Sequence, residues 1–191
     1  MTIANYLRRL RLYLGSSVVL LSAGVVLGVL AIPYAPDLAH RFGESVGGFV
    51  QLFRELPKPQ LALAIFLNNT LKTFLVVIGG VLLGVVPVIF LLVNGGALGF
   101  VLYLSIQHRG VFDSLVAILP HGVLELPAVL MGTSLGLLIG ATAIRRIFGN
   151  TALALRTELA LALRFFVSVI IPLLAAAALV ESFVTSALVK M

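Results

Sequence analysis

The sequence predicts an all-α integral membrane protein, a polytopic helical bundle of about five transmembrane helices. Of its 191 residues, 61% are hydrophobic and only 10% are charged, and the mean hydropathy is +1.18. Its apolar runs have the length of roughly 20 residues that a helix needs to cross a bilayer. Basic residues gather at the ends of these runs, as they do on the cytoplasmic side of membrane proteins. We expect residues 1–191 to form one integral membrane domain, with no room for a separate soluble one.

Composition also excludes several classes of function. The chain contains no cysteine, which excludes disulfides, thiolate metal sites and cysteine nucleophiles. The net charge of +6 is explained by topology, because the basic residues do not line one polar face. We therefore expect membrane lipid as a partner and no nucleic acid.

Each predicted span follows from a run of apolar residues. The five spans cover residues 12–33, 61–93, 97–107, 113–144 and 164–185. The first run follows a basic N-terminal segment and exceeds the length of a secretory signal, so it is a retained span. The second is longer than one crossing requires and is interpreted as a long or broken helix. The uncharged Asn94-Gly95-Gly96 predicts the turn that follows it.

Residues 37–56 differ from these runs because charged side chains are interspersed with apolar ones. The apolar residues recur every three or four positions, which indicates an amphipathic helix too polar to span. Pro57 ends it. We expect this helix in the outer interface, where it covers the bundle; docking of a partner is the alternative.

One crossing per span places the N-terminus in the cytoplasm and the C-terminus outside the cell membrane. The arginines at positions 8–11 and 145–156 then lie on the same side, as the positive-inside rule requires.

The fourth span contains the most informative motif, a histidine and a carboxylate between two prolines. Pro120 and Pro127 lack the N–H that a helix needs, so a helix break is predicted at Pro120-His121-Gly122. His121 and Glu125 are four residues apart and project from one helix face. Ionisable groups at membrane depth indicate a functional site with a partner to be found.

A weak internal repeat suggests that partner. With a shift of 53 residues, Asn68 aligns with His121, Lys72 with Glu125 and Gly79 with Gly132. The two segments would run in the same direction as a parallel repeat. Lys72 and Glu125 would then lie at similar depth and form a buried ion pair; a protonated Glu125 is the alternative.

Glycines recur at four-residue spacing in most spans, which allows helix backbones to approach closely. These glycines are Gly24 and Gly28, Gly80 and Gly84, Gly95 and Gly99, and Gly132, Gly136 and Gly140. Most of this packing is expected within the chain. The last group is the best candidate for a homo-oligomer interface.

Three motifs, in this order and spacing, resemble the stage II sporulation protein M (SpoIIM) family. They are Asn68-Asn69, Asn94-Gly95-x-x-Leu98-Gly99 and Pro120-His121-Gly122-x-x-Glu125-Leu126-Pro127-Ala128. The resemblance covers about residues 60–145 and implies a polytopic prokaryotic membrane protein. In spore-forming bacteria, members anchor a complex that recruits peptidoglycan hydrolases. Because relatives also occur in organisms that do not sporulate, what carries over is a membrane protein that organises protein partners.

The resemblance also implies a polar centre, with a structural or a functional role. Its members are Asn68, Asn69, Asn94, Gly95, His121 and Glu125, to which Gly122 and Lys72 are added from the reasoning above.

Three functions are compatible with this centre. A scaffold or assembly factor is preferred, and a transporter or channel that uses His121, Glu125 and Lys72 is the alternative. A third possibility is a metal-dependent hydrolase, but the chain has no His-Glu-x-x-His motif. We therefore expect no enzyme, no catalytic residue, no bound metal and no cofactor.

Overall fold

The described part of the protein is helical throughout. The computed structural model describes residues 3–34, 56–149 and 154–185, but not the side chains of residues 3–5, 115–121 and 184–185. Helix α1 (Ile3–Ala31) ends in the short 3-10 turn η1 (Ile32–Tyr34). It is followed by α3 (Lys58–Gly79), α4 (Val85–Arg109) and α5 (Val111–Ile147). The last helical stretch comprises α6 (Leu155–Phe165), the π-helix η2 (Phe166–Ile170), α7 (Ile171–Val180) and the π-helix η3 (Glu181–Thr185).

Five of these stretches are long and apolar enough to cross a membrane. They are Tyr6–Tyr34, Lys58–Gly79, Val85–Arg109, Gly122–Ile147 and Leu155–Phe183. The prediction of a polytopic helical bundle is confirmed. The proposed interfacial helix falls almost entirely on residues 35–55, which lie outside the described residues.

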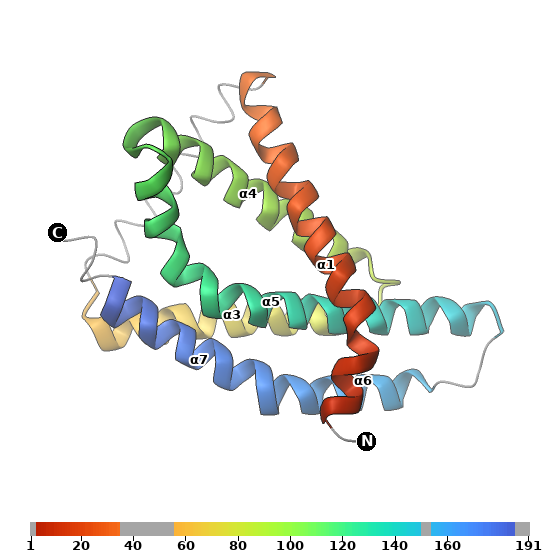
Figure 1. The fold of residues 1–191 in the computed structure, drawn as a ribbon. Helices are drawn as coiled ribbons and strands as arrows, with labels where there is room; N and C mark the ends of the chain where they lie inside the picture. Colours follow the sequence, from red (N-terminus) through yellow and green to blue (C-terminus); the bar gives the residue numbers. More distant parts are fainter. Residues whose placement is uncertain (1–2, 35–55, 150–153, 186–191) are drawn as a thin grey trace.

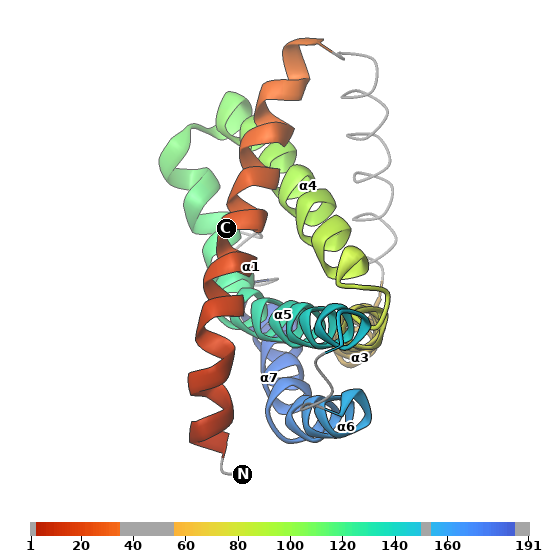
Figure 2. The same cartoon turned by 90° about the vertical axis from the view of Figure 1, so that its right-hand side faces the viewer.

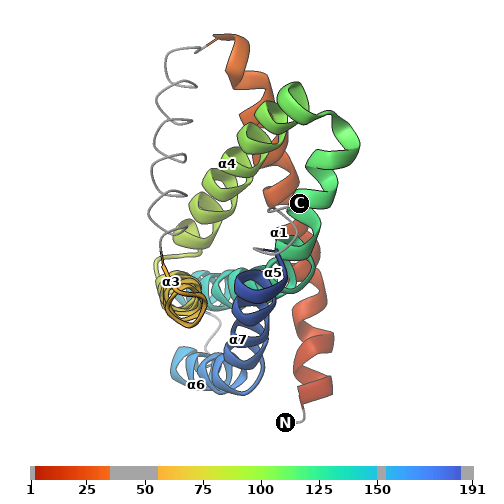
Figure 3. The ribbon, with the colours of Figure 1, turned by 90° about the vertical axis from the view of Figure 1, so that its left-hand side faces the viewer.

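The main core lies between α3, α5 and the α6–α7 stretch, which run alongside one another (Figure 1). Fully buried aliphatic and aromatic side chains fill the space between them, among them Val77, Leu135, Ile139, Phe166 and Ile170. Helix α1 passes along one side of this group and also packs on α4 (Figure 2). Figure 3 shows α4 leaning against α1 from the other side.

The turn between the second and third spans lies earlier than predicted. Helix α3 ends at Gly79, and the chain turns through residues 80–84 before α4 begins. Gly84 has a φ of 78°, a left-handed conformation that glycine adopts without steric cost. The predicted turn at Asn94-Gly95-Gly96 is wrong, because these residues lie inside α4. Neither the glycines of residues 79–84 nor those of Asn94-Gly95-Gly96 are flanked by charged residues. Composition therefore could not distinguish the turn from the helix.

The predicted break at Pro120-His121-Gly122 is a bend within a continuous helix. The backbone of α5 is helical from Val111 to Ile147. Figure 1 shows its N-terminal portion changing direction before the long C-terminal portion begins. A proline inside a helix removes one hydrogen bond and causes such a kink. The rest of the ladder keeps the helix intact.

The last span begins earlier than the predicted start at residue 164. Helix α6 begins at Leu155, so the stretch that the sequence assigned to a cytoplasmic loop is helical. Its first turn carries Glu158, which is buried.

Helices α3 and α5 run in the same direction, as the proposed repeat requires. Thr73 contacts Gly132, and further along both helices the turn residue Gly84 contacts Gly140. The pairing offset is therefore 59 residues at the first contact and 56 at the second, rather than 53. Lys72 is level with about residue 131, roughly 9 Å along α5 from Glu125 at 1.5 Å per residue.

Candidate functional site

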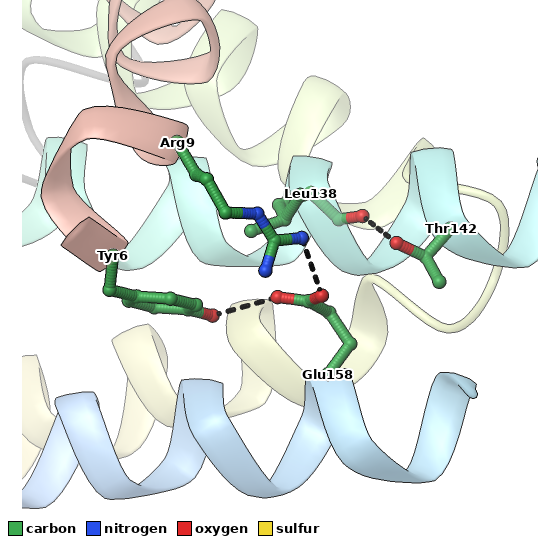
Figure 4. A network of polar contacts seen from close by, with 5 residues as sticks. All are labelled: Tyr6, Arg9, Leu138, Thr142 and Glu158. Carbon is green, nitrogen blue, oxygen red and sulfur yellow. Dashed lines mark hydrogen bonds and ion pairs between the residues drawn. The ribbon is translucent and has the colours of Figure 1, made fainter. Parts of the chain in front are cut away.

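A buried carboxylate joins the first helix to the last. Glu158 on α6 is 2% exposed and accepts a hydrogen bond of 2.8 Å from an Arg9 Nη on α1. Its other oxygen accepts one of 3.2 Å from the Tyr6 hydroxyl (Figure 4). The Tyr6 ring packs on Phe165, with ring centroids 5.6 Å apart. We call Tyr6, Arg9 and Glu158 the α1–α6 clamp.

Local sequence explains why this carboxylate is held well. Glu158 stands in the first turn of α6, where the helix dipole favours negative charge. Arg9 provides a delocalised cation with several donors, suited to an ion pair at low water content. The clamp therefore satisfies both carboxylate oxygens without water.

Deeper in the bundle, hydroxyl groups connect α1 to α5. The Ser17 and Ser134 oxygens are 3.0 Å apart, and the Thr133 hydroxyl oxygen lies 3.3 Å from that of Ser17. All three side chains are fully buried. Hydroxyls at such positions bond across membrane helices and also satisfy their own helix carbonyls; Thr133, for example, donates to the Val129 carbonyl at 3.0 Å.

Further along α1, glycines bring its backbone against α4. A Cβ placed on Gly24 would lie 2.6 Å from the Leu92 carbonyl oxygen and 3.0 Å from the Cα of Gly95. A Cβ on Gly28 would collide with Gly96, and one on Gly99 with the Val25 backbone. These residues form the α1–α4 glycine seam. This is the role that Gly95, predicted as part of a polar centre, has in the structure.

The glycines proposed as a homo-oligomer interface are covered by the chain itself. Gly132 contacts Thr73, Gly136 lies under Val76 and Pro87, and Gly140 meets the backbone of the α3–α4 turn. All three are buried. Helix α3 and the following turn therefore occupy the surface that was predicted as a subunit interface, Gly132, Gly136 and Gly140. Homo-oligomerisation itself stays a prediction.

The asparagines of the predicted polar centre make local contacts. The Asn68 amide donates to the Asn69 side chain at 3.1 Å within α3. The Asn94 amide donates to the Phe90 carbonyl at 2.8 Å within α4, and Asn94 is exposed. Their described hydrogen bonds thus stay within their own helices.

The α5 part of the polar centre is described only partly. Gly122 and Glu125 are half-buried on α5. The side chain of His121 lies outside the described residues, so its role stays a prediction. Within the described part of the chain, no three acidic or histidine side chains form a metal-ligand group.

The predicted pair of Lys72 with Glu125 is not among the ion pairs that the structure describes. Lys72 is exposed on α3, and the ion pair described in the structure joins Arg9 to Glu158 instead. The register of α3 against α5 places Lys72 well past Glu125, and its side chain lies on the outer surface. A lysine near the centre of a membrane helix costs about 2.5 to 3.5 kcal/mol, so its exposure within a predicted span is notable.

Reasoning from sequence missed the clamp and the serine contact. Glu158 precedes residue 164, the predicted start of the last span, so it was not considered as a group within the bundle. A usable signal existed, since Glu158 is an acidic residue within a helix that is otherwise apolar on its buried face. Ser17 and Ser134 gave no signal, because small hydroxyl residues are common in membrane helices.

Comparison with protein families identifies the group to which the chain is related. The family model for stage II sporulation protein M matches residues 17–186. The chain belongs to this family. The prediction from the motifs between residues 68 and 128 is confirmed, and the match extends well beyond them to most of the chain.

The SpoIIM match includes only one of the three residues of the α1–α6 clamp. Glu158 lies within the matched residues, whereas Tyr6 and Arg9 precede them. No curated protein and no solved structure is significantly similar to this chain. Family membership and the five spans together make this an integral membrane protein.

Proposed function

We propose that this SpoIIM protein is a membrane scaffold that organises partner proteins and does not itself transform or transport a substrate. One observation carries the proposal: the described, fully buried polar side chains are all engaged within the protein. They bond to another helix, as in the clamp and the Ser17–Ser134 contact, or to a carbonyl of their own helix, as in Thr73 and Thr142. Among half-buried residues, two side-chain atoms accept or donate no hydrogen bond: the Thr70 hydroxyl, and Oε2 of Glu125, whose side chain has another interaction.

This use of polar groups supports a structural role. A transport path needs polar side chains that remain available to a solute or to water. A hydrolase needs a base and an activated nucleophile or metal in reach of a substrate. Polar groups that bond to each other instead fix the helices in place, and a rigid bundle with an extensive exposed surface suits the presentation of a binding face.

We further propose that the N-terminus is cytoplasmic and the C-terminus extracytoplasmic. With this orientation, the exposed Arg8, Arg11, Arg145, Arg146 and Arg156 all lie on the cytoplasmic side, as the positive-inside rule favours. The absence of native cysteine allows single cysteines to report sidedness. Tyr34→Cys and Phe148→Cys, both strongly exposed in the wild type, should react with an impermeant thiol reagent from opposite sides. Labelling from the same side would contradict the five-span orientation.

The scaffold function is tested by comparing partner retention with flux. Extracted in native-lipid particles, the protein should retain a protein partner at a fixed stoichiometry, and the purified protein alone in liposomes should move no solute. Saturable flux by the isolated protein that is lost in Glu125→Ala would instead establish transport. Particles that contain only this chain and lipid would contradict the scaffold.

A further inference from the structure

The outer face of α3 carries a lysine within a predicted membrane span. Lys72 is exposed there, and no described ion pair or hydrogen bond involves it. Around it, a row of leucines at four-residue spacing is more than half exposed: Leu63, Leu67, Leu71 and Leu75. The exposed surface thus combines an apolar ridge with a cation. We call it the α3 face.

The depth of Lys72 prevents it from reaching water easily. It lies seven residues before the end of α3 at Gly79, about 10 Å along the axis. Long basic side chains near a helix end can extend to the interface. In a helix, however, the Cα–Cβ bond tilts toward the N-terminus, which directs Lys72 away from its nearer end and toward the middle of the span. The ammonium therefore stays at hydrocarbon depth.

Lys58, on the same helix, illustrates the alternative. It stands at the first residue of α3, and its ammonium lies 5.7 Å from the centroid of the Phe183 ring. At a helix end, a lysine has both water and an aromatic face within reach. Lys72 has neither of these in the described structure, so the two lysines form a matched pair for experiment.

We propose that the α3 face binds a transmembrane helix of another protein that carries an aspartate or glutamate at the depth of Lys72. This inference rests on the proposed scaffold function and specifies the chemistry of the partner. An ammonium has three donors and no acceptor, and a carboxylate is the acceptor that also neutralises its charge. The leucine row provides the close van der Waals contact on which helix association in lipid depends.

A second copy of this chain is a poor occupant of the α3 face. A two-fold contact through the same surface brings Lys72 of each copy toward the other, and two ammonium groups at low dielectric repel. The buried carboxylate Glu158 is already bonded to Arg9 and Tyr6. Charge complementarity therefore favours a different protein that contributes the acid.

A synthetic membrane helix tests this inference without knowledge of the partner. The probe is a leucine–alanine transmembrane peptide with one aspartate at the matching depth, and its controls carry asparagine or alanine there. The full-length protein, labelled through Phe148→Cys, is reconstituted with each peptide, and association is measured by energy transfer. We expect the aspartate peptide to bind about tenfold more tightly than the asparagine peptide.

The variants decide whether Lys72 causes the preference. Lys72→Met should abolish the preference for aspartate, and Lys58→Met should leave it unchanged. Because Lys72 is exposed, its replacement should leave the helix packing intact. Circular dichroism and thermal unfolding of the variant check this. Equal binding of aspartate and alanine peptides, or a preference retained in Lys72→Met, overturns the inference. So does self-association of the protein without peptide that Lys72→Met removes.

These results are independent of the test of the scaffold function. If a native partner is retained equally by wild type and Lys72→Met, the α3 face is not its binding surface and the scaffold still stands. If no partner is found but the aspartate peptide binds through Lys72, the scaffold function fails while the chemistry of the α3 face holds.

Discussion

The two ends of α1 are attached to the bundle in opposite ways. Its later half forms the α1–α4 glycine seam, where backbone lies directly on backbone. Its start forms the α1–α6 clamp, where a guanidinium and a hydroxyl both donate hydrogen bonds to a buried carboxylate. The seam depends on the absence of side chains, whereas the clamp depends on their chemistry. A seam of this kind tolerates no added atom, but a clamp can be weakened in steps.

The largest effect is expected from adding a side chain to the glycine seam. Gly95→Leu places atoms against the Leu21 carbonyl and the Cα of Gly24, 3.0 Å from the new Cβ. Because neither backbone can rotate away, we expect a loss of at least about 3 kcal/mol in the free energy of unfolding. Unfolding in mixed micelles measures it.

Gly15→Leu, on the same helix, is the matched control. No other atom lies within 4 Å of a Cβ at Gly15. Leucine also favours the helix by up to about 1 kcal/mol over glycine, so this variant should be neutral or slightly more stable. Equal losses in both variants would show that the seam does not determine stability.

An intermediate and asymmetric effect is expected at the clamp. Arg9→Met leaves the Glu158 side chain, which is 3% exposed, without its cation, and should cost about 2 to 3 kcal/mol. Glu158→Gln leaves Arg9, which is 36% exposed and reaches water, and should cost only about 1 kcal/mol. Thermal and denaturant unfolding compare the two. Arg8→Met serves as the control, since Arg8 is exposed; the reverse order of losses would contradict the burial of Glu158.

The smallest effect is expected at the hydroxyl contact of α1 with α5, which lies along α1 between the clamp and the seam. In a double-mutant cycle of Ser17→Ala and Ser134→Ala, the coupling energy should be about 0.6 kcal/mol. The two oxygens are 3.0 Å apart, but when the other serine is lost, Ser134 retains the Leu130 carbonyl and Ser17 retains the Thr133 hydroxyl. Ser16→Ala is the control, because Ser16 is exposed and bonds only to the Leu12 carbonyl of its own helix. A coupling energy above about 2 kcal/mol would contradict this prediction, because the hydroxyl contact would then stabilise the protein as much as the clamp does.

The same comparison explains what the sequence could predict. Apolar length identified five spans, and the glycine spacing predicted close helix packing. Glycine, however, serves both turns and tight helix crossings. Gly84 ends up in a turn and Gly95 inside a helix, a difference decided by the helix that lies opposite. That information is tertiary and is absent from any local window.

The clamp was unpredictable for another reason. Arg9 was assigned to topology, as basic residues at the start of a span usually are. Its bond to Glu158 depends on how the first and last helices cross, which spacing along the chain does not encode. Lys72 and Glu125 illustrate the converse, because an apparent sequence alignment suggested a pair at one depth, whereas the register of α3 against α5 offsets the two residues and Lys72 is exposed.

The separation of Arg9 from Glu158, 149 positions along the chain, has a consequence for biosynthesis. At 5 to 20 residues per second, a ribosome needs about 7 to 30 s to produce the acidic residue after the basic one. The glycine seam is complete much earlier, once residue 99 has been made and inserted. We therefore expect the growing chain to hold its first helix through α4 while Arg9 stays at the membrane surface. The clamp can close only after Glu158 has been made and α6 has been inserted.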